Sequence, residues 1–179
     1  GTNDDKFCVI HVGPHKTGST TLQGFLVTNE AERFKVALNK DNYEVPIFPA
    51  PRVRKNHSAL VKCLQGKGNG CSNNFNYFES FVNNAAENGS NILLSSEEFD
   101  KEDVNMTRLS NFLVPEYKIH VVLYYRRFYD WIHSVHNQIA KTFDHRPFVE
   151  WLTQEAFDSR TNMYSLALYN RYQKVPGVF

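Results

Sequence analysis

The sequence lacks long apolar runs and any marked excess of one charge. No stretch of about 18 or more apolar residues occurs, so the printed chain holds no candidate membrane span; an N-terminal anchor outside it stays open. Twenty basic and 19 acidic residues leave a net charge of +1, which excludes nucleic-acid binding by bulk charge. Any anion must therefore bind at a local site.

Cysteine is also scarce, with three in 179 residues. Cys8 lies in a strand-like apolar run and is expected to be buried packing. Cys63 and Cys71 flank a glycine-containing segment. They are either unrelated thiols or the ends of a short disulfide loop, which would indicate an oxidising compartment.

Three N-x-S/T triplets, the acceptor pattern of N-glycosylation, begin at Asn56, Asn88 and Asn105. Their number is close to chance expectation, and they are compatible with a secretory lumen.

Composition and periodicity indicate one α/β domain. Hydrophobic residues make up 41% and charged residues 22%, which excludes a disordered chain. We expect a single domain over residues 1–179, with an inserted loop-rich region at 40–74. Apolar runs predict buried strands at 6–12, 91–95 and 118–125, and helical spacing predicts helices at 20–31, 58–64, 75–88, 106–113, 127–142, 147–157 and 163–172. The alternation predicts three layers, α/β/α, around a central parallel sheet, with ligands bound where the strands end.

The segment after the first expected strand carries the strongest chemical signal. It runs Gly13-Pro14-His15-Lys16-Thr17-Gly18-Ser19-Thr20-Thr21, between a strand and a helix start. Backbone N–H groups and the helix dipole at such a loop attract phosphate, and Lys16 adds a point charge. Gly13 and Gly18 have the spacing of the nucleotide-triphosphatase P-loop, but Ser19 stands where that motif has lysine. The loop therefore predicts an anion cradle and disfavours an ordinary kinase; a helix cap without a ligand is the alternative.

The two other expected strands also end in polar residues. Arg126 and Ser134 lie eight positions apart on one face of the next helix, and a guanidinium with a hydroxyl suits a phosphate. The alternative is an exposed arginine paired with Asp130. After the second strand, Glu97 is the first candidate for a general base and Glu98 the second. The alternative there is a helix cap by Ser96, with both glutamates in the first turn.

These three segments together resemble the sulfotransferases that use 3′-phosphoadenosine 5′-phosphosulfate (PAPS). P-H-K-T-G-S-T-T-L, from Pro14, is similar to their 5′-phosphosulfate loop, close to P-K-[ST]-G-[ST]-[ST], with His15 as an extra residue. Arg126 and Ser134 match the spacing of their 3′-phosphate motif. The segment ending in Glu97 and Glu98 looks like the one that carries the base in many carbohydrate sulfotransferases. The resemblance implies a P-loop-NTPase-like sulfotransferase fold.

The resemblance also implies an activity: transfer of a sulfuryl group from PAPS to a hydroxyl or amine, leaving 3′,5′-ADP. Lys16 would stabilise the leaving phosphate, Glu97 or Glu98 would accept the acceptor's proton, and His15 could touch the sulfonate or the acceptor. No metal is expected, because no metal-ligand spacing occurs. The implied cofactor-binding residues are Pro14, His15, Lys16, Thr17, Gly18, Ser19, Thr20, Thr21, Arg126 and Ser134.

The acceptor is expected to be a carbohydrate or another small molecule, and the favoured location is the Golgi lumen, with the cytoplasm as the alternative. Two competing functions remain: a P-loop small-molecule or nucleotide kinase, and a non-catalytic nucleotide-binding module of the same fold. Family members continue beyond this length with a further strand and a basic, glycine-containing segment. The resemblance therefore predicts either a fragment, incomplete at its C-terminus, or a reduced family member.

Overall fold

Four parallel strands form the centre of the computed structural model, which describes residues 5–12, 32–48, 57–124, 128–141, 145–155 and 165–178. The strands are β1 (Phe7–Val12), β2 (Tyr43–Glu44), β3 (Asn91–Ser96) and β4 (Lys118–Leu123), in the sheet order β2-β3-β1-β4. Every named strand pair is parallel, so β1 is central, between β3 and β4. The expected α/β fold with a parallel sheet is confirmed.

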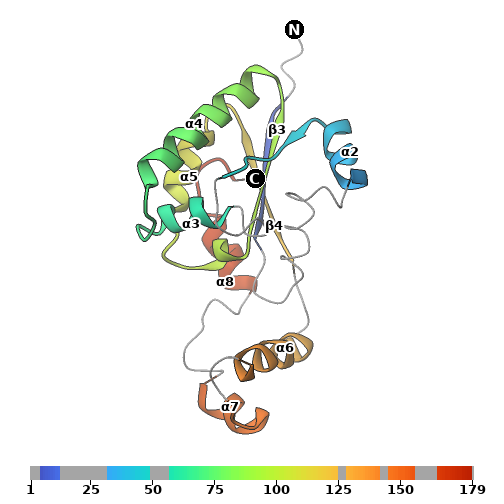
Figure 1. Ribbon diagram of the computed structural model, residues 1–179, viewed down its shortest axis with the longest axis vertical. Coiled ribbons are helices and arrows are strands. Elements are labelled where there is room, and N and C mark those ends of the chain that lie inside the picture. Colours follow the sequence, from blue (N-terminus) through green and yellow to red (C-terminus); the bar gives the residue numbers. More distant parts are fainter. Residues whose placement is uncertain are drawn as a thin grey trace.

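Helices flank this sheet on both faces. Figure 1 shows α3, α4 and α5 on one face and α2 on the other, with the sheet seen nearly edge-on. The expected helices at 58–64 and 106–113 are found with those bounds, whereas the one expected at 20–31 lies outside the described residues. The helical elements are α2 (Glu32–Lys40), α3 (Ser58–Leu64), α4 (Cys71–Glu87), the 3₁₀ turn η3 (Glu97–Asp100), α5 (Met106–Leu113), α6 (Phe128–Ala140), α7 (Phe148–Glu155) and α8 (Ser165–Tyr172).

The main hydrophobic core lies between the sheet and helices α3 to α5. Successive side chains of a strand point to opposite faces, so every second residue of β1 enters this core. Cys8, Ile10 and Val12 are the ones that do, and each is at most 1% exposed. The expectation that Cys8 is buried is confirmed, and this burial raises the pKa of its thiol. His11 belongs to the opposite face of the sheet.

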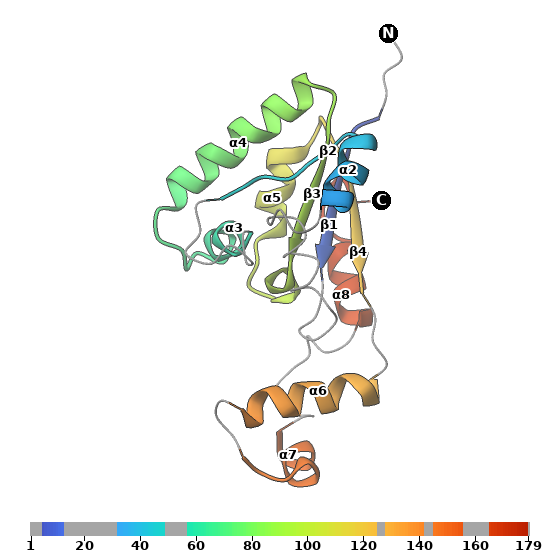
Figure 2. The same ribbon diagram turned by 45° about the vertical axis from the view of Figure 1, so that its right-hand side comes forward.

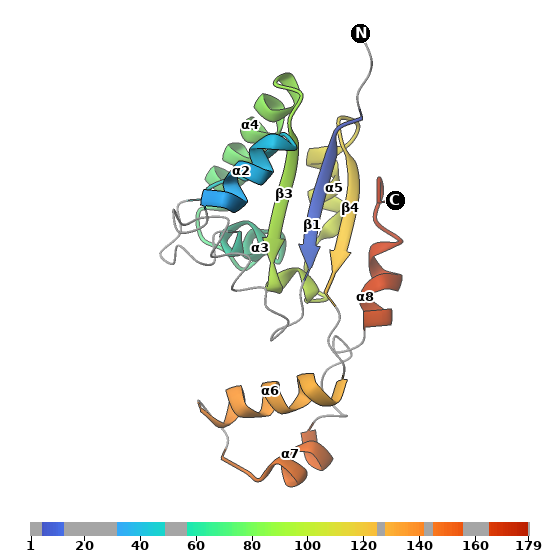
Figure 3. The ribbon, with the colours of Figure 1, turned by 90° about the vertical axis from the view of Figure 1, so that its right-hand side faces the viewer.

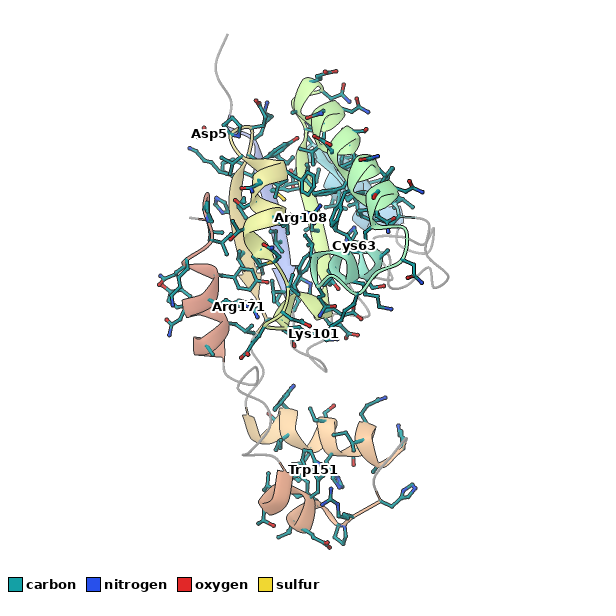
Figure 4. All side chains as sticks on the ribbon, turned by 90° about the vertical axis from the view of Figure 1, so that its left-hand side faces the viewer. Asp5, Cys63, Lys101, Arg108, Trp151 and Arg171 are labelled. Carbon is teal, nitrogen blue, oxygen red and sulfur yellow. A yellow bond between two sulfur atoms is a disulfide. The ribbon has the colours of Figure 1, made fainter. Side chains whose placement is uncertain are left out.

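The region 40–74 contains more structure than its composition suggested. Tyr43 and Glu44 form the edge strand β2, which is too short to leave a periodic signal. Farther along, a disulfide between Cys63 and Cys71 joins the end of α3 to the start of α4, with 5.2 Å between the Cα atoms. Figure 4 labels Cys63 in this position. Of the two interpretations left open by the sequence, the disulfide loop is therefore the one the structure has.

Two further parts complete the described chain. Beside β4, Val178 pairs in parallel with Ile119, and α8 packs nearby. Helices α6 and α7 pack on each other around Trp131, Ile132, Val135 and Trp151, a small cluster separate from the main core (Figures 2 and 4). The helix expected at 127–142 is thus found, as α6 over Phe128–Ala140. None of the helices in the described segments has the length and apolar character that a membrane span requires.

Candidate functional site

The carboxyl ends of the three longer strands lie side by side. Val12, the last residue of β1, pairs with Ser96 at the end of β3 and with Leu123 at the end of β4. Figure 3 shows the three arrowheads pointing to the same edge. The chain therefore leaves this edge three times, into the segments that begin at Gly13, Glu97 and Tyr124. The predicted parallel sheet thus brings the ends of the three predicted strands together.

The edge between β1 and β3 is a topological switch point. After β1 the chain continues to α2 on one face of the sheet, whereas after β3 it continues through η3 to α5 on the opposite face (Figures 1 and 3). The helices that follow the two strands in the described chain therefore lie on opposite faces of the sheet. In open α/β sheets, ligands bind at such positions. The topology thus favours the same edge that the polar motifs favour.

Glu97 and Glu98 lie at this edge, in the 3₁₀ turn η3. The backbone N–H of Glu98 donates to the Ser96 hydroxyl at 3.2 Å. The helix cap by Ser96, which the sequence offered as the alternative, is therefore present. Glu97 is 6% exposed. Glu98 is half-buried, and its Oε2 atom is buried without a hydrogen-bond partner in the described chain. The cap and a role in proton transfer are compatible, because the cap orients the turn that carries both carboxylates.

Helix α8 holds the other end of this turn. Arg171 donates from Nη2 to the carbonyl of Phe99 at 2.6 Å and from Nη1 to that of Asp100 at 3.0 Å. The Tyr172 hydroxyl donates to the same Phe99 carbonyl at 2.8 Å. Burial raises the pKa of Tyr172, so its phenol stays a neutral donor. Residues of α8, which is distant in the sequence, therefore fix the orientation of η3 (Glu97–Asp100), called the glutamate turn below.

His11 is a site residue that sequence reasoning missed. It is 2% exposed, pairs in register with Ser95 of β3, and places its Nδ1 atom 2.8 Å from the Ser95 hydroxyl. Its ring also meets that of Tyr124, which follows β4, with 4.4 Å between centroids. Nε2 is buried without a hydrogen-bond partner among the described residues. The only sequence signal was a polar residue in an apolar run, two positions before Gly13.

A second buried histidine has a structural role at the same edge. The edge strand β2 pairs with Asn91 and Ile92, so on this side no strand of the described chain lies beside the later residues of β3. There, Nδ1 of His57 accepts from the Ser95 N–H at 2.8 Å, and Nε2–H donates to the Pro46 carbonyl at 3.1 Å. Burial lowers the pKa of His57, which favours the neutral ring that this arrangement needs.

Several sequence-predicted site residues lie outside the described residues: Pro14, His15, Lys16, Thr17, Gly18, Ser19, Thr20, Thr21 and Arg126, and also Asn56. Ser134 is described and is half-buried on α6, one helical turn after the exposed Asp130. The structure thus brings the glutamate turn to the end of β1. Of the residues predicted to bind phosphate it describes Ser134, and for the others it describes the strand ends that precede their segments.

Comparison with protein-family models, with curated proteins and with solved structures gave no match. Across the described segments, no three or more His, Cys, Asp or Glu side chains gather as a metal-binding group. The case for a particular chemistry therefore depends on the motifs and on where the sheet places them.

Proposed function

We propose that this chain transfers a sulfuryl group from PAPS to a hydroxyl or amine of an acceptor, with carbohydrates as the favoured class. One observation carries the proposal: Val12 lies in register with both Ser96 and Leu123. The loop that resembles a phosphosulfate cradle, the glutamate turn and the arginine segment therefore start from neighbouring strands at one edge. This is the arrangement that a donor and an acceptor bound side by side require.

The described residues at this edge fit a polar, anionic ligand. Nε2 of His11 and Oε2 of Glu98 are both buried without a hydrogen-bond partner in the described part of the chain. Buried polar atoms nearly always have a partner in folded proteins, and unpaired ones are costly. A donor-bearing nitrogen suits a phosphate or sulfonate oxygen, and a carboxylate oxygen suits the hydroxyl of an acceptor. A third such atom, Nε of Arg171, lies on the residue that holds the turn, and the other two match the two halves of the proposed reaction.

When bound, PAPS would supply an activated sulfuryl group, whose sulfur would bond to the oxygen or nitrogen of the acceptor as its bond to the bridging phosphate oxygen breaks. The carboxylate of Glu97 or Glu98 takes the proton that the acceptor loses. Lys16 offsets the negative charge that collects on the departing phosphate. Arg126 and Ser134 bind the 3′-phosphate, which distinguishes PAPS from ATP. Catalysis then consists of positioning and charge stabilisation.

The oxidised cysteine pair supports a lumenal location. A disulfide such as Cys63–Cys71 persists in oxidising compartments and is rare in the cytosol. Asn88 and Asn105, which begin two of the glycosylation triplets, are both exposed. We therefore propose the secretory-pathway lumen, where carbohydrate acceptors are also available.

Calorimetric titration of the chain with 3′,5′-ADP and with 5′-ADP tests the donor site. We expect 3′,5′-ADP to bind at least about tenfold more tightly, because the extra phosphate makes charge-assisted hydrogen bonds. Arg126→Ala should abolish this preference. Arg108→Ala is the matched control, since Arg108 lies on α5 over the ring of Phe75, 3.9 Å from its centroid. Equal affinity for the two nucleotides would favour a kinase-like site instead.

Transfer itself is tested with radiolabelled PAPS and a panel of oligosaccharides. Incorporation of label that Glu97→Gln or Glu98→Gln lowers by about 10²–10⁴-fold, without loss of 3′,5′-ADP binding, would identify the base. Tight and selective binding of 3′,5′-ADP without turnover of any acceptor would point to a non-catalytic module.

A further inference from the structure

We propose that His11 is a further ligand-binding residue of this site, whose Nε2 atom donates a hydrogen bond to an oxygen of the donor's 5′-phosphate end. The inference rests on the proposed function and deepens it, because it assigns a described residue to the reacting end of the donor. His11 stands two positions before Gly13, where the phosphosulfate-like loop begins. It also lies next to the switch point between β1 and β3, because it pairs in register with Ser95, one residue before β3 ends.

Contacts from both neighbouring strands orient the His11 ring. On the β3 side, Nδ1 lies 2.8 Å from the hydroxyl of Ser95. On the β4 side, the Tyr124 ring lies 4.4 Å away between centroids, at an interplanar angle of 57°. Because Nδ1 is occupied by Ser95, the opposite ring nitrogen remains available for another partner. The ring is therefore held in place before any ligand arrives.

Nε2 is a hydrogen-bond donor in the tautomer in which Nδ1 accepts from the Ser95 hydroxyl. Burial lowers the pKa of His11, so the neutral ring, with one N–H, is the form at neutral pH. If the Ser95 hydroxyl donates to Nδ1, the proton of the ring is on Nε2. That N–H is then buried without an acceptor in the described chain. An anionic oxygen bound at the edge would supply the acceptor and remove this penalty.

His57 shows what a structural histidine looks like in the same protein. Both of its ring nitrogens have backbone partners, at Ser95 and Pro46. His11 has a comparable degree of burial, but among the described residues only its Nδ1 atom has a hydrogen-bond partner. His57 therefore has a structural role through both ring nitrogens, whereas Nε2 of His11 can accommodate a ligand as its partner.

Two substitutions separate the ring nitrogens of His11. His11→Asn keeps an amide near the position of Nδ1 and removes the Nε2 group, whereas His11→Gln reaches the position of Nε2. We expect His11→Asn to weaken 3′,5′-ADP binding at least about tenfold, the value of one hydrogen bond to a charged group, and His11→Gln to retain affinity within about threefold. Binding of 3′-AMP, which lacks the 5′-phosphate, should change little in either variant. His120→Gln, at an exposed histidine of β4, is the control.

Each outcome of this titration is decisive. Equal affinities of wild type, His11→Asn and His11→Gln would overturn the role of His11 while leaving the donor site intact. Loss confined to His11→Gln would show that the Ser95 contact matters, and it would also overturn the proposal. If wild type binds 5′-ADP and 3′,5′-ADP alike but the Asn and Gln variants still differ, His11 binds a phosphate and the PAPS proposal fails. If wild type binds neither nucleotide, both proposals fail.

A measurement on the wild-type protein covers the case in which a variant does not fold. The ¹⁵N chemical shift of His11 Nε2 should move on saturation with 3′,5′-ADP and stay in place with 3′-AMP. An unchanged shift with both nucleotides would overturn the assignment, because a new hydrogen bond at Nε2 must alter the shielding of that nucleus.

Discussion

Removing the disulfide between Cys63 and Cys71 should lower the free energy of unfolding by about 2.5 kcal/mol. The bridge closes a loop with a sequence separation of 8. In the chain-entropy relation, a cross-link over about eight residues removes that amount of freedom from the unfolded chain. The bridge also fixes the end of α3 against the start of α4, and α3 belongs to the main core through Leu60 and Val61.

The assay is urea denaturation of wild type and of Cys63→Ser/Cys71→Ser, followed by circular dichroism. Wild type with reductant should match the double variant, and reductant should leave the double variant unchanged. Cys8→Ser is not a suitable control, because it introduces a hydroxyl into the core. Stabilities that agree within about 0.5 kcal/mol, the range of a neutral surface substitution, would refute the reasoning.

Gly68 provides a second test of the same bridge. A Cβ atom at this position would lie 2.7 Å from Sγ of Cys63 and 2.8 Å from Sγ of Cys71, which is closer than such atoms approach. Gly68→Ala should therefore destabilise the oxidised protein by about 1–3 kcal/mol, the usual cost of overpacking. Adding Cys71→Ala removes one of the two sulfurs, so the penalty should shrink in that background. A penalty that is the same in both backgrounds would mean that the clash is not with the bridge.

The remaining predictions concern pH and the glutamate turn. Because burial lowers the pKa of His57 below the ordinary value of 6.5, the unfolded chain takes up the proton more readily, and the free energy of unfolding should fall as the pH drops below about 6.5. The slope from this one group cannot exceed about 1.4 kcal/mol per pH unit, and denaturant titrations across that range should give a smaller slope for His57→Gln than for His145→Gln, at an exposed site. Tyr172→Phe should cost about 1 kcal/mol of stability, because one of the donors to the Phe99 carbonyl is lost, and thermal melts would show no change if this contact were unimportant. If α8 orients the glutamate turn, Arg171→Ala should lower the turnover of labelled PAPS while 3′,5′-ADP binds as before; a change in nucleotide affinity alone would contradict that role.

Much of the secondary structure follows from local patterns in the sequence. The runs that became β1, β3 and β4 are apolar enough to be recognised as buried strands, and α3 and α5 have the bounds that helical spacing predicts. Burial of a strand or helix face imposes a period on the residues that form it, so these elements leave a signal in a single sequence. The convergence of three polar segments also follows, because parallel strands end at one edge.

The candidate site depended on the tertiary structure in its decisive details. The contact between His11 and Ser95 joins residues 84 positions apart, and the clamp of Arg171 on Phe99 spans 72. Neither leaves a periodic pattern, because each depends on one side chain meeting a partner from a distant element. The two-residue strand β2 and the pairing of Cys63 with Cys71 are of the same kind. The sequence by itself determined which segments are strands, helices and polar loops. Only the tertiary structure decided that His11 contacts Ser95 where β3 ends, and which polar atoms of the described residues have no partner there, because packing decides which atoms become neighbours.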